Sequence, residues 1–103
     1  MYALSDEAKK KLKEPLPGDL RSATVAIKPE VELDVDGQAA VNVYVILNDT
    51  VAKKISTART RSVLNRIRDE IGRRVSDVSP DLWTYVHFRG ASEEKSRAYR
   101  TDR

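Results

Sequence analysis

The residues best suited to chemistry in this chain alternate along one short stretch, as Tyr85, His87 and Arg89. A phenol, an imidazole and a guanidinium can transfer protons and stabilise negative charge without a metal, as in a metal-free ribonuclease. The alternative is that His87, the only histidine, is a surface residue without a chemical role. Since the rest of the sequence offers no partner for such a site, the pattern favours a protein that is not an enzyme.

The motifs of other site classes are missing. There is no cysteine, which excludes thiolate zinc sites and cysteine nucleophiles, and His87 has no further ligands at metal-binding spacing. No glycine-rich phosphate loop, nucleophile elbow or close carboxylate pair on an apolar background occurs. We therefore assign no catalytic, cofactor-binding or metal-binding residue and expect no cofactor.

The stretch around His87 alternates as a strand from Leu82 to Arg89. Both of its sides are partly apolar, so the inward face is ambiguous; by analogy with the other strands we place Val86 and Phe88 in the core. The opposite side then carries Trp83, Tyr85, His87 and Arg89.

A long antiparallel hairpin is predicted from Val25 to Leu47, with its turn at Asp36-Gly37. Apolar residues take alternate positions in both arms, namely Val25, Ile27, Val31, Leu33 and Val35, then Val41, Val43, Val45 and Leu47. Pro29 removes one backbone donor, so the first arm should lie at a sheet edge or carry a bulge there.

Two helices complete the prediction. Ser5 caps a short one from about Asp6 to Lys13, before a turn at Pro17-Gly18. A long one begins between Thr50 and Thr57 and ends near Val75, with its apolar stripe at Leu64, Ile67, Ile71 and Val75.

At 103 residues the chain suits one domain. We predict a single α+β domain over residues 1–103, in the order α-β-β-α-β, with the helices packed on one face of the sheet. Residues from about 90 to 103 form a polar tail, in which Ser92 is a candidate cap for a last helical turn. No apolar run approaches the roughly 20 residues of a membrane span, so we expect no membrane contact and a cytoplasmic location.

Charge is distributed unevenly behind the net value of +3. Residues 1–50 carry six basic and nine acidic groups, whereas residues 51–103 carry thirteen basic and seven acidic ones. Arg59, Arg66 and Arg73 repeat every seven residues and project away from the apolar stripe of the long helix. They could bind RNA, or they could form a solvated helix face in which acidic neighbours neutralise part of the charge.

The bare face of the sheet offers a different hypothesis. If Trp83 and Tyr85 share that face with Tyr44 and Ile46, and with His87 and Arg89 nearby, they form an aromatic patch typical of binding sites. We therefore predict a small protein-interaction module, such as an adaptor, an accessory subunit or a toxin-neutralising partner. It would bind a protein partner, or a second copy of itself, through this face or an edge of the sheet. The alternatives are an RNA-binding module, a metal-free ribonuclease, and a Trp83 that simply belongs to the core.

Two stretches resemble a known family. Ala40–Val45 on the second strand, and Ile67–Val75 leading to Pro80-Asp81-Leu82, are similar to ribosome-binding factor A, an RNA-associated KH-type domain. The resemblance covers about residues 31–88 and implies an RNA-binding KH-like module. The first helix is much shorter here and the Ala-x-Gly kink of that family's central helix is missing, so no RNA-binding residue is transferred.

Overall fold

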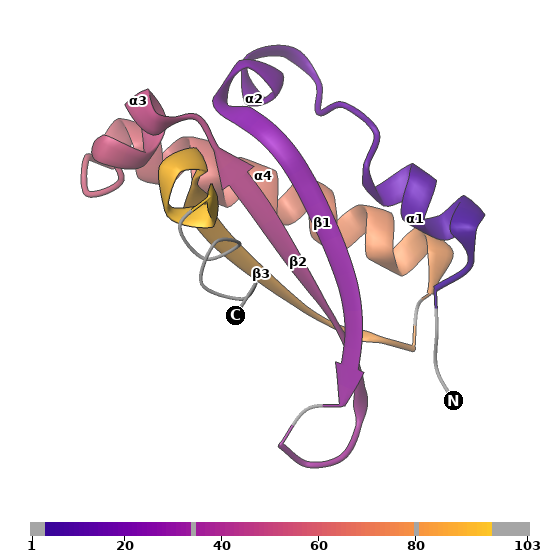
Figure 1. Cartoon of the computed structure of the whole chain (residues 1–103). Helices are drawn as coiled ribbons and strands as arrows, with labels where there is room; N and C mark the ends of the chain where they lie inside the picture. The colour runs from indigo at the N-terminus through magenta and orange to yellow at the C-terminus, as the bar shows by residue number, and fades with distance from the viewer. Residues whose placement is uncertain (1–3, 34, 80, 96–103) are drawn as a thin grey trace.

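The computed structural model describes residues 4–33, 35–79 and 81–95. Its elements are α1 (Asp6–Leu12), α2 (Gly18–Ala23), β1 (Thr24–Leu33), β2 (Ala39–Leu47), α3 (Asp49–Lys53), α4 (Ala58–Val78) and β3 (Trp83–Gly90) (Figure 1). Residues 91–95 add one more helical turn. The predicted α+β class and the order α-β-β-α-β are confirmed, with short helices added to the predicted set.

The sheet has three strands in the order β1-β2-β3. β1 and β2 pair antiparallel through a turn in which Gly37 has φ of +77°, a conformation that glycine adopts without strain. β2 and β3 pair parallel, because α4 carries the chain back along the sheet between them. The prediction that Pro29 lies on an edge strand is confirmed, and the one register irregularity of β1 lies between Thr24 and Ala26 instead.

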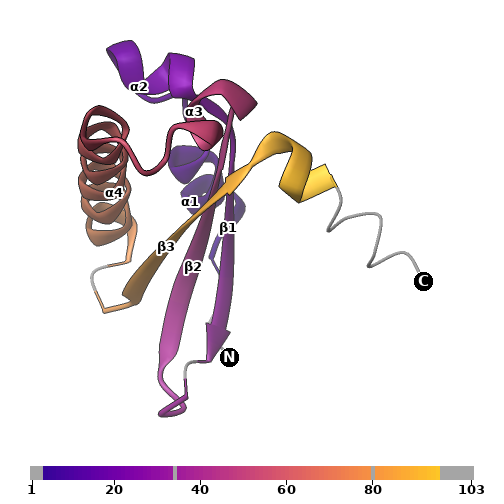
Figure 2. The same cartoon turned by 90° about the vertical axis from the view of Figure 1, so that its left-hand side faces the viewer.

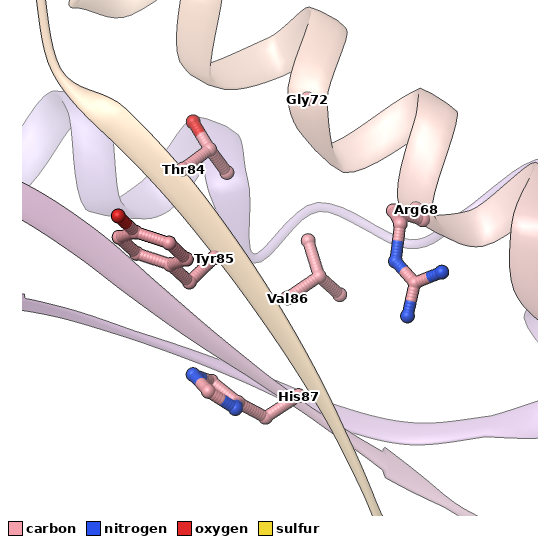
Figure 3. A pocket seen from close by; sticks show the side chains of 6 residues that line it. All are labelled: Arg68, Gly72, Thr84, Tyr85, Val86 and His87. Atoms are coloured by element: carbon pink, nitrogen blue, oxygen red, sulfur yellow. The ribbon is translucent and has the colours of Figure 1, made fainter.

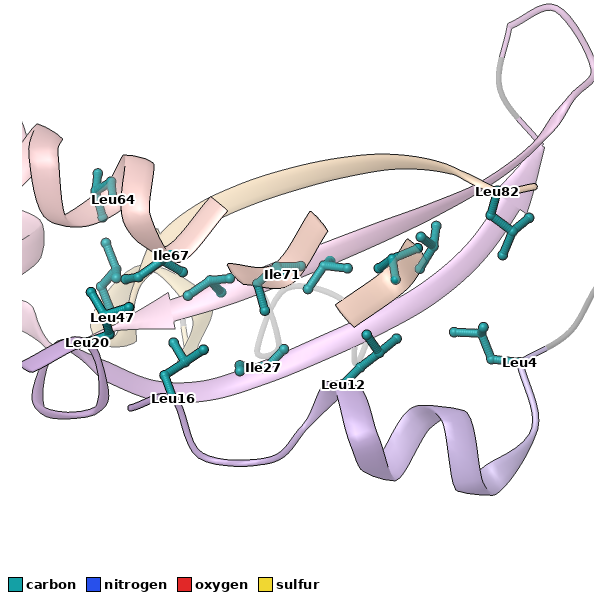
Figure 4. Packing of buried hydrophobic residues seen from close by; sticks show 14 residues of the cluster. Leu4, Leu12, Leu16, Leu20, Ile27, Leu47, Leu64, Ile67, Ile71 and Leu82 are labelled. Carbon is teal, nitrogen blue, oxygen red and sulfur yellow. The ribbon is translucent and has the colours of Figure 1, made fainter. Parts of the chain in front are cut away.

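The core lies between the sheet and α4. All four residues of the predicted stripe, Leu64, Ile67, Ile71 and Val75, are buried, and they belong to one cluster with Val41, Val43, Val45 and Leu47 of β2 (Figure 4). Leu12, Leu16 and Leu20 extend this cluster from α1, α2 and the segment between them. Within residues 4–33, 35–79 and 81–95, no layer covers most of the side of the sheet that faces away from α4 (Figure 2).

The ends of β1 differ from the prediction. Val25, Leu33 and Val35 were expected on the apolar face, but all three are exposed. Val25 lies at the register irregularity, which turns its side chain away from the core. Leu33 and Val35 lie near the hairpin turn, which extends beyond the helices (Figure 1). Alternation is a local signal and does not reveal where the helical layer stops.

The predicted long helix corresponds to α4, which follows its cap Thr57, the late limit of the predicted start. Two short helices were not predicted. One is α3, capped by Asn48 and separated from α4 by residues 54–57. The predicted turn at Pro17-Gly18 is the start of α2. Among the described residues, no helix has both the length and the apolar character needed to cross a membrane.

The predicted polar tail begins as ordered structure. The Asp49 carboxylate accepts hydrogen bonds from the Ser92 backbone N–H at 3.0 Å and from its hydroxyl at 2.7 Å, which holds the turn at 91–95 against the start of α3. The Ser92 hydroxyl lowers the pKa of Asp49. At Gly90 an added Cβ would lie 3.0 Å from the Ala52 Cβ, so the close approach of β3 to α3 favours glycine there. Residues 96–103 of the predicted tail lie outside the described residues.

Candidate interaction surface on β3

The two faces of β3 have opposite surroundings. Thr84 and Val86 point toward α4, whereas Tyr85 and His87 point to the other side of the strand (Figure 3). In the parallel register with β2, Trp83 lies next to Ala40, Tyr85 next to Asn42, His87 next to Tyr44 and Arg89 next to Ile46. The six predicted partner-binding residues therefore lie on one face of the sheet, which we call the outer face.

Trp83 and Tyr85 are the open part of the outer face. Their side chains are 60% and 44% exposed, so the alternative that Trp83 belongs to the core is excluded. The indole N–H of Trp83 donates to Gln38 Oε1 at 2.8 Å, which fixes the ring while leaving its surface in solvent. A large ring held in place and exposed is well suited to contact a partner.

The middle of the outer face is a stack of rings. Tyr44 and His87 stack with centroids 4.9 Å apart and an interplanar angle of 21°. Nε2 of His87 lies 2.8 Å from Asn42 Oδ1, and the Arg89 guanidinium lies 4.1 Å from the centre of the Tyr44 ring. These contacts hold the aromatic side chains in a rigid row.

The far end of the outer face is covered. Glu94 pairs with Lys28 and with Arg89, at 3.2 Å in both cases, and the turn at 91–95 lies on this side of the sheet (Figure 2). Burial raises the pKa of Glu94, but the hydrogen bonds and charges of Arg89 and Lys28 outweigh it and hold that pKa below its usual value. Ile46 at this end is only 3% exposed. Ile46 and Arg89 are thus on the predicted face but outside its open part.

A groove lies beside β3, at the edge of the strand that does not pair with β2. It has a volume of about 330 Å³ and is lined by Arg68, Gly72, Thr84, Tyr85, Val86 and His87 (Figure 3). Sequence reasoning did not select Arg68 or Gly72. The available signal was Gly72 itself, because a glycine inside a helical pattern needs a packing or functional reason.

The three arginines predicted to bind RNA differ in their surroundings. Arg66 forms a two-pronged pair with Asp19 at 2.9 and 3.1 Å and lowers the pKa of that carboxyl, and Arg73 pairs with Glu70. Arg59 has no ion pair with any described residue. It lines a second cavity, of about 450 Å³, at the start of α4.

Metal-binding chemistry is not found in the part of the chain that the structure describes, where no three His, Asp or Glu side chains come close enough to hold an ion. His87 instead has an amide and an aromatic ring as neighbours.

The fold and this surface define a small α+β domain with a mixed three-stranded sheet, one buried face and one partly open face. Comparison with protein-family models, curated proteins and solved structures gave no match. The resemblance to ribosome-binding factor A thus stays an expectation from the sequence.

Proposed function

We propose that this chain is a non-enzymatic protein-interaction module that binds a partner protein through the open part of its outer face. The observation that carries the proposal is the exposure of Trp83 and Tyr85 side by side on a rigid strand. Burying a large apolar side chain stabilises a fold by about 2 kcal/mol, and the folded domain does without this free energy at both exposed aromatic residues.

The rest of the domain supports this reading. The core forms one buried cluster between the sheet and the helices, and the two aromatic residues are not needed to complete it. Tryptophan and tyrosine are the side chains that most often anchor protein interfaces. The ring stack of Tyr44 and His87 stiffens the surface next to them, which lowers the entropy lost on binding.

The test compares a Trp83→Ala/Tyr85→Ala variant with Val25→Ala, which removes an equally exposed apolar side chain from β1. Tagged chains are used to capture partners from the source cells, and folding is checked by circular dichroism. We expect the double variant to lose partners that wild type and Val25→Ala retain, because it removes the anchors. Its melting temperature should stay within about 5 °C of the wild-type value.

Two results would contradict the proposal. Partners that remain bound to the double variant would show that the open part of the outer face is not the contact surface. A double variant that unfolds would show that both side chains contribute to the core, so their exposure would not signal a binding site.

A second candidate function is RNA binding at the α3–α4 turn. The observation that favours it is the group of Lys54, Arg59 and Arg61, none of which pairs with a described acidic residue, beside a helix without an acid in its first turn. The positive end of the α4 dipole and these cations would together attract a phosphate backbone.

Fluorescence anisotropy with labelled mixed-sequence single-stranded RNA tests this candidate. We expect binding that weakens steeply with salt and falls at least tenfold in Lys54→Glu/Arg59→Glu. Arg73→Ala, which removes an arginine already paired with Glu70, is the control and should bind as wild type does. Affinity that ignores both the salt and the double variant would rule RNA out at this turn.

A further inference from the structure

We infer that the edge of β3 that pairs with no described strand accepts an extended segment of another protein as a fourth strand, and that Arg68 selects segments carrying a carboxylate. This inference rests on the proposed function and deepens it, since it names the conformation and the charge of the partner. The contact differs from the outer face: it uses the backbone of β3 and the groove toward α4.

The two edges of the sheet are protected to different degrees. β1 contains Pro29, which has no backbone N–H to donate, and a register irregularity between Thr24 and Ala26. It also contains the charged residues Lys28, Glu30 and Glu32. Such features prevent another chain from pairing with an edge strand. β3 has eight residues in an unbroken register, with no proline, lysine or acidic residue among them. An edge of this kind can pair with an added strand.

The groove has the position that an added strand would need. Tyr85 and His87 send their side chains to the outer face, yet they line the groove together with Thr84 and Val86 of the inner face (Figure 3). A groove lined by residues of both faces lies along the backbone edge of the strand. A new strand would lie about 4.8 Å from β3 and would point every second side chain toward α4.

Gly72 provides room for such a side chain. It lies inside α4, where glycine costs about 1 kcal/mol relative to alanine. No positive φ explains it, and no heavy atom outside its own helix backbone and its chain neighbours lies within 4 Å of an added Cβ. Nothing in the packing of the described chain requires a glycine there, whereas an incoming side chain would use the space.

Arg68 gives the groove its charge. It is the one arginine of the lining, which contains no lysine or carboxylate. Its guanidinium lies 5.3 Å from the centre of the Phe88 ring and makes a long hydrogen bond of 3.5 Å to Asn65. No described carboxylate pairs with it. A guanidinium held by a ring and lacking an acid is prepared for a two-pronged bond with a carboxylate.

The same charges argue against a second copy of this chain as the added strand. β3 itself contains no carboxylate, so pairing β3 with β3 would leave Arg68 without an acid. It would also bring together two chains of net charge +3. An acidic segment of another protein satisfies both the backbone edge and Arg68.

The experiment selects phage-displayed random octapeptides on the immobilised full chain. We expect enriched peptides to alternate β-branched or aromatic residues with other residues and to carry Asp or Glu at one groove-facing position. Synthetic copies should bind at least tenfold more weakly to Arg68→Glu and to Gly72→Leu. The Gly72→Leu change fills the groove and raises helix propensity, so its effect would not come from unfolding. In an added strand, every second backbone N–H of the peptide donates to β3. Methylating these nitrogens removes the donors and should also abolish binding.

The control is Arg21→Glu, which makes the same charge change on α2, outside the groove, and should leave peptide affinity unchanged within twofold. No enriched peptide, or peptides whose binding survives both groove variants, would overturn the inference. So would sedimentation showing that the chain dimerises through β3.

The inference and the proposed function can fail separately. Peptide binding that is lost with Trp83→Ala but kept with Arg68→Glu would leave the outer face as the contact and remove the edge. Peptide binding that depends on Arg68, with partner capture unaffected by Trp83→Ala/Tyr85→Ala, would do the reverse.

Discussion

Arg74 joins α4 to the segment between α1 and α2. Its Nε donates to Glu70 Oε2 at 3.0 Å, and its terminal nitrogens donate to the carbonyl oxygens of Glu14 and Pro15 at 2.7 and 3.2 Å. The side chain is only 14% exposed, so these bonds are partly shielded from water. One arginine thus satisfies two carbonyl groups of a connection that contains two prolines and has few other backbone partners.

Replacing this side chain by one of similar length without charge should destabilise the domain. We expect Arg74→Met to lower the free energy of unfolding by about 2 kcal/mol, because it removes hydrogen bonds from a charged donor and leaves their acceptors unpaired. Urea denaturation measures the change. Arg73→Met is the matched control: Arg73 pairs with the same Glu70 but is well exposed, so its loss should change stability little. Equal effects of the two variants would contradict this account.

At the scale of elements, the break between α3 and α4 decides where the basic residues gather. Thr57, the late limit of the predicted start of the long helix, takes an extended conformation with ψ of 147° and caps α4, which leaves α3 as a separate helix. Its hydroxyl accepts from the Thr60 backbone N–H at 3.3 Å. The break exposes Lys54 and Arg59 around one turn and places that turn beside the second cavity.

Removal of this cap tests whether Thr57 sets the start of α4. We expect Thr57→Ala to lower the free energy of unfolding by about 1 kcal/mol, because the first turn of α4 loses a side-chain acceptor. Ser56→Ala changes the preceding exposed hydroxyl and should have almost no effect. Thermal and urea unfolding report both changes. If Ser56→Ala costs as much as Thr57→Ala, the cap is assigned to the wrong residue.

At the scale of the whole molecule, three carboxylates hold together parts of the chain that are far apart in sequence. Asp19 of α2 binds Arg66 of α4, Asp49 holds the turn at 91–95, and Glu94 joins β1 to β3. A fourth, Glu70, pairs within α4 with Arg73 and Arg74. The pKa of each of these carboxyls is below its usual value, for Glu70 mainly because of the hydrogen bond from Arg73.

This pattern predicts acid sensitivity with a defined sign. A carboxyl whose pKa is lower in the folded state stabilises it above the unfolded pKa, and this contribution is lost as the pH falls through the folded value. We expect the melting temperature to stay nearly constant between about pH 7 and pH 5, then to fall toward about pH 3.

At about pH 7, Asp19→Asn should have a lower melting temperature than wild type. Between about pH 5 and pH 3 its melting temperature should fall less than that of wild type, because it lacks one of the four carboxyls. Differential scanning calorimetry across this range measures both effects. A melting temperature that is constant down to about pH 3 would show that these carboxyls do not stabilise the folded state.

The sequence alone determined the features that depend on neighbouring residues. Alternating side chains defined the hairpin and the two faces of β3, and spacings of three and four defined the buried stripe of α4, because strands and helices impose these periods locally. The same rule put Trp83, Tyr85 and His87 on one side of β3, and the packing of α4 decided that this side is the outer face.

Only the tertiary structure decided how these elements meet. It paired β3 parallel to β2, buried Ile46, neutralised Arg66 through Asp19 and placed Arg68 and Gly72 beside an edge of β3 that pairs with no described strand. These features depend on residues far apart in the chain, 47 positions for Asp19 and Arg66 and 66 for Lys28 and Glu94. Local periods do not encode contacts between residues so far apart in the chain, since such contacts form only when the elements pack together.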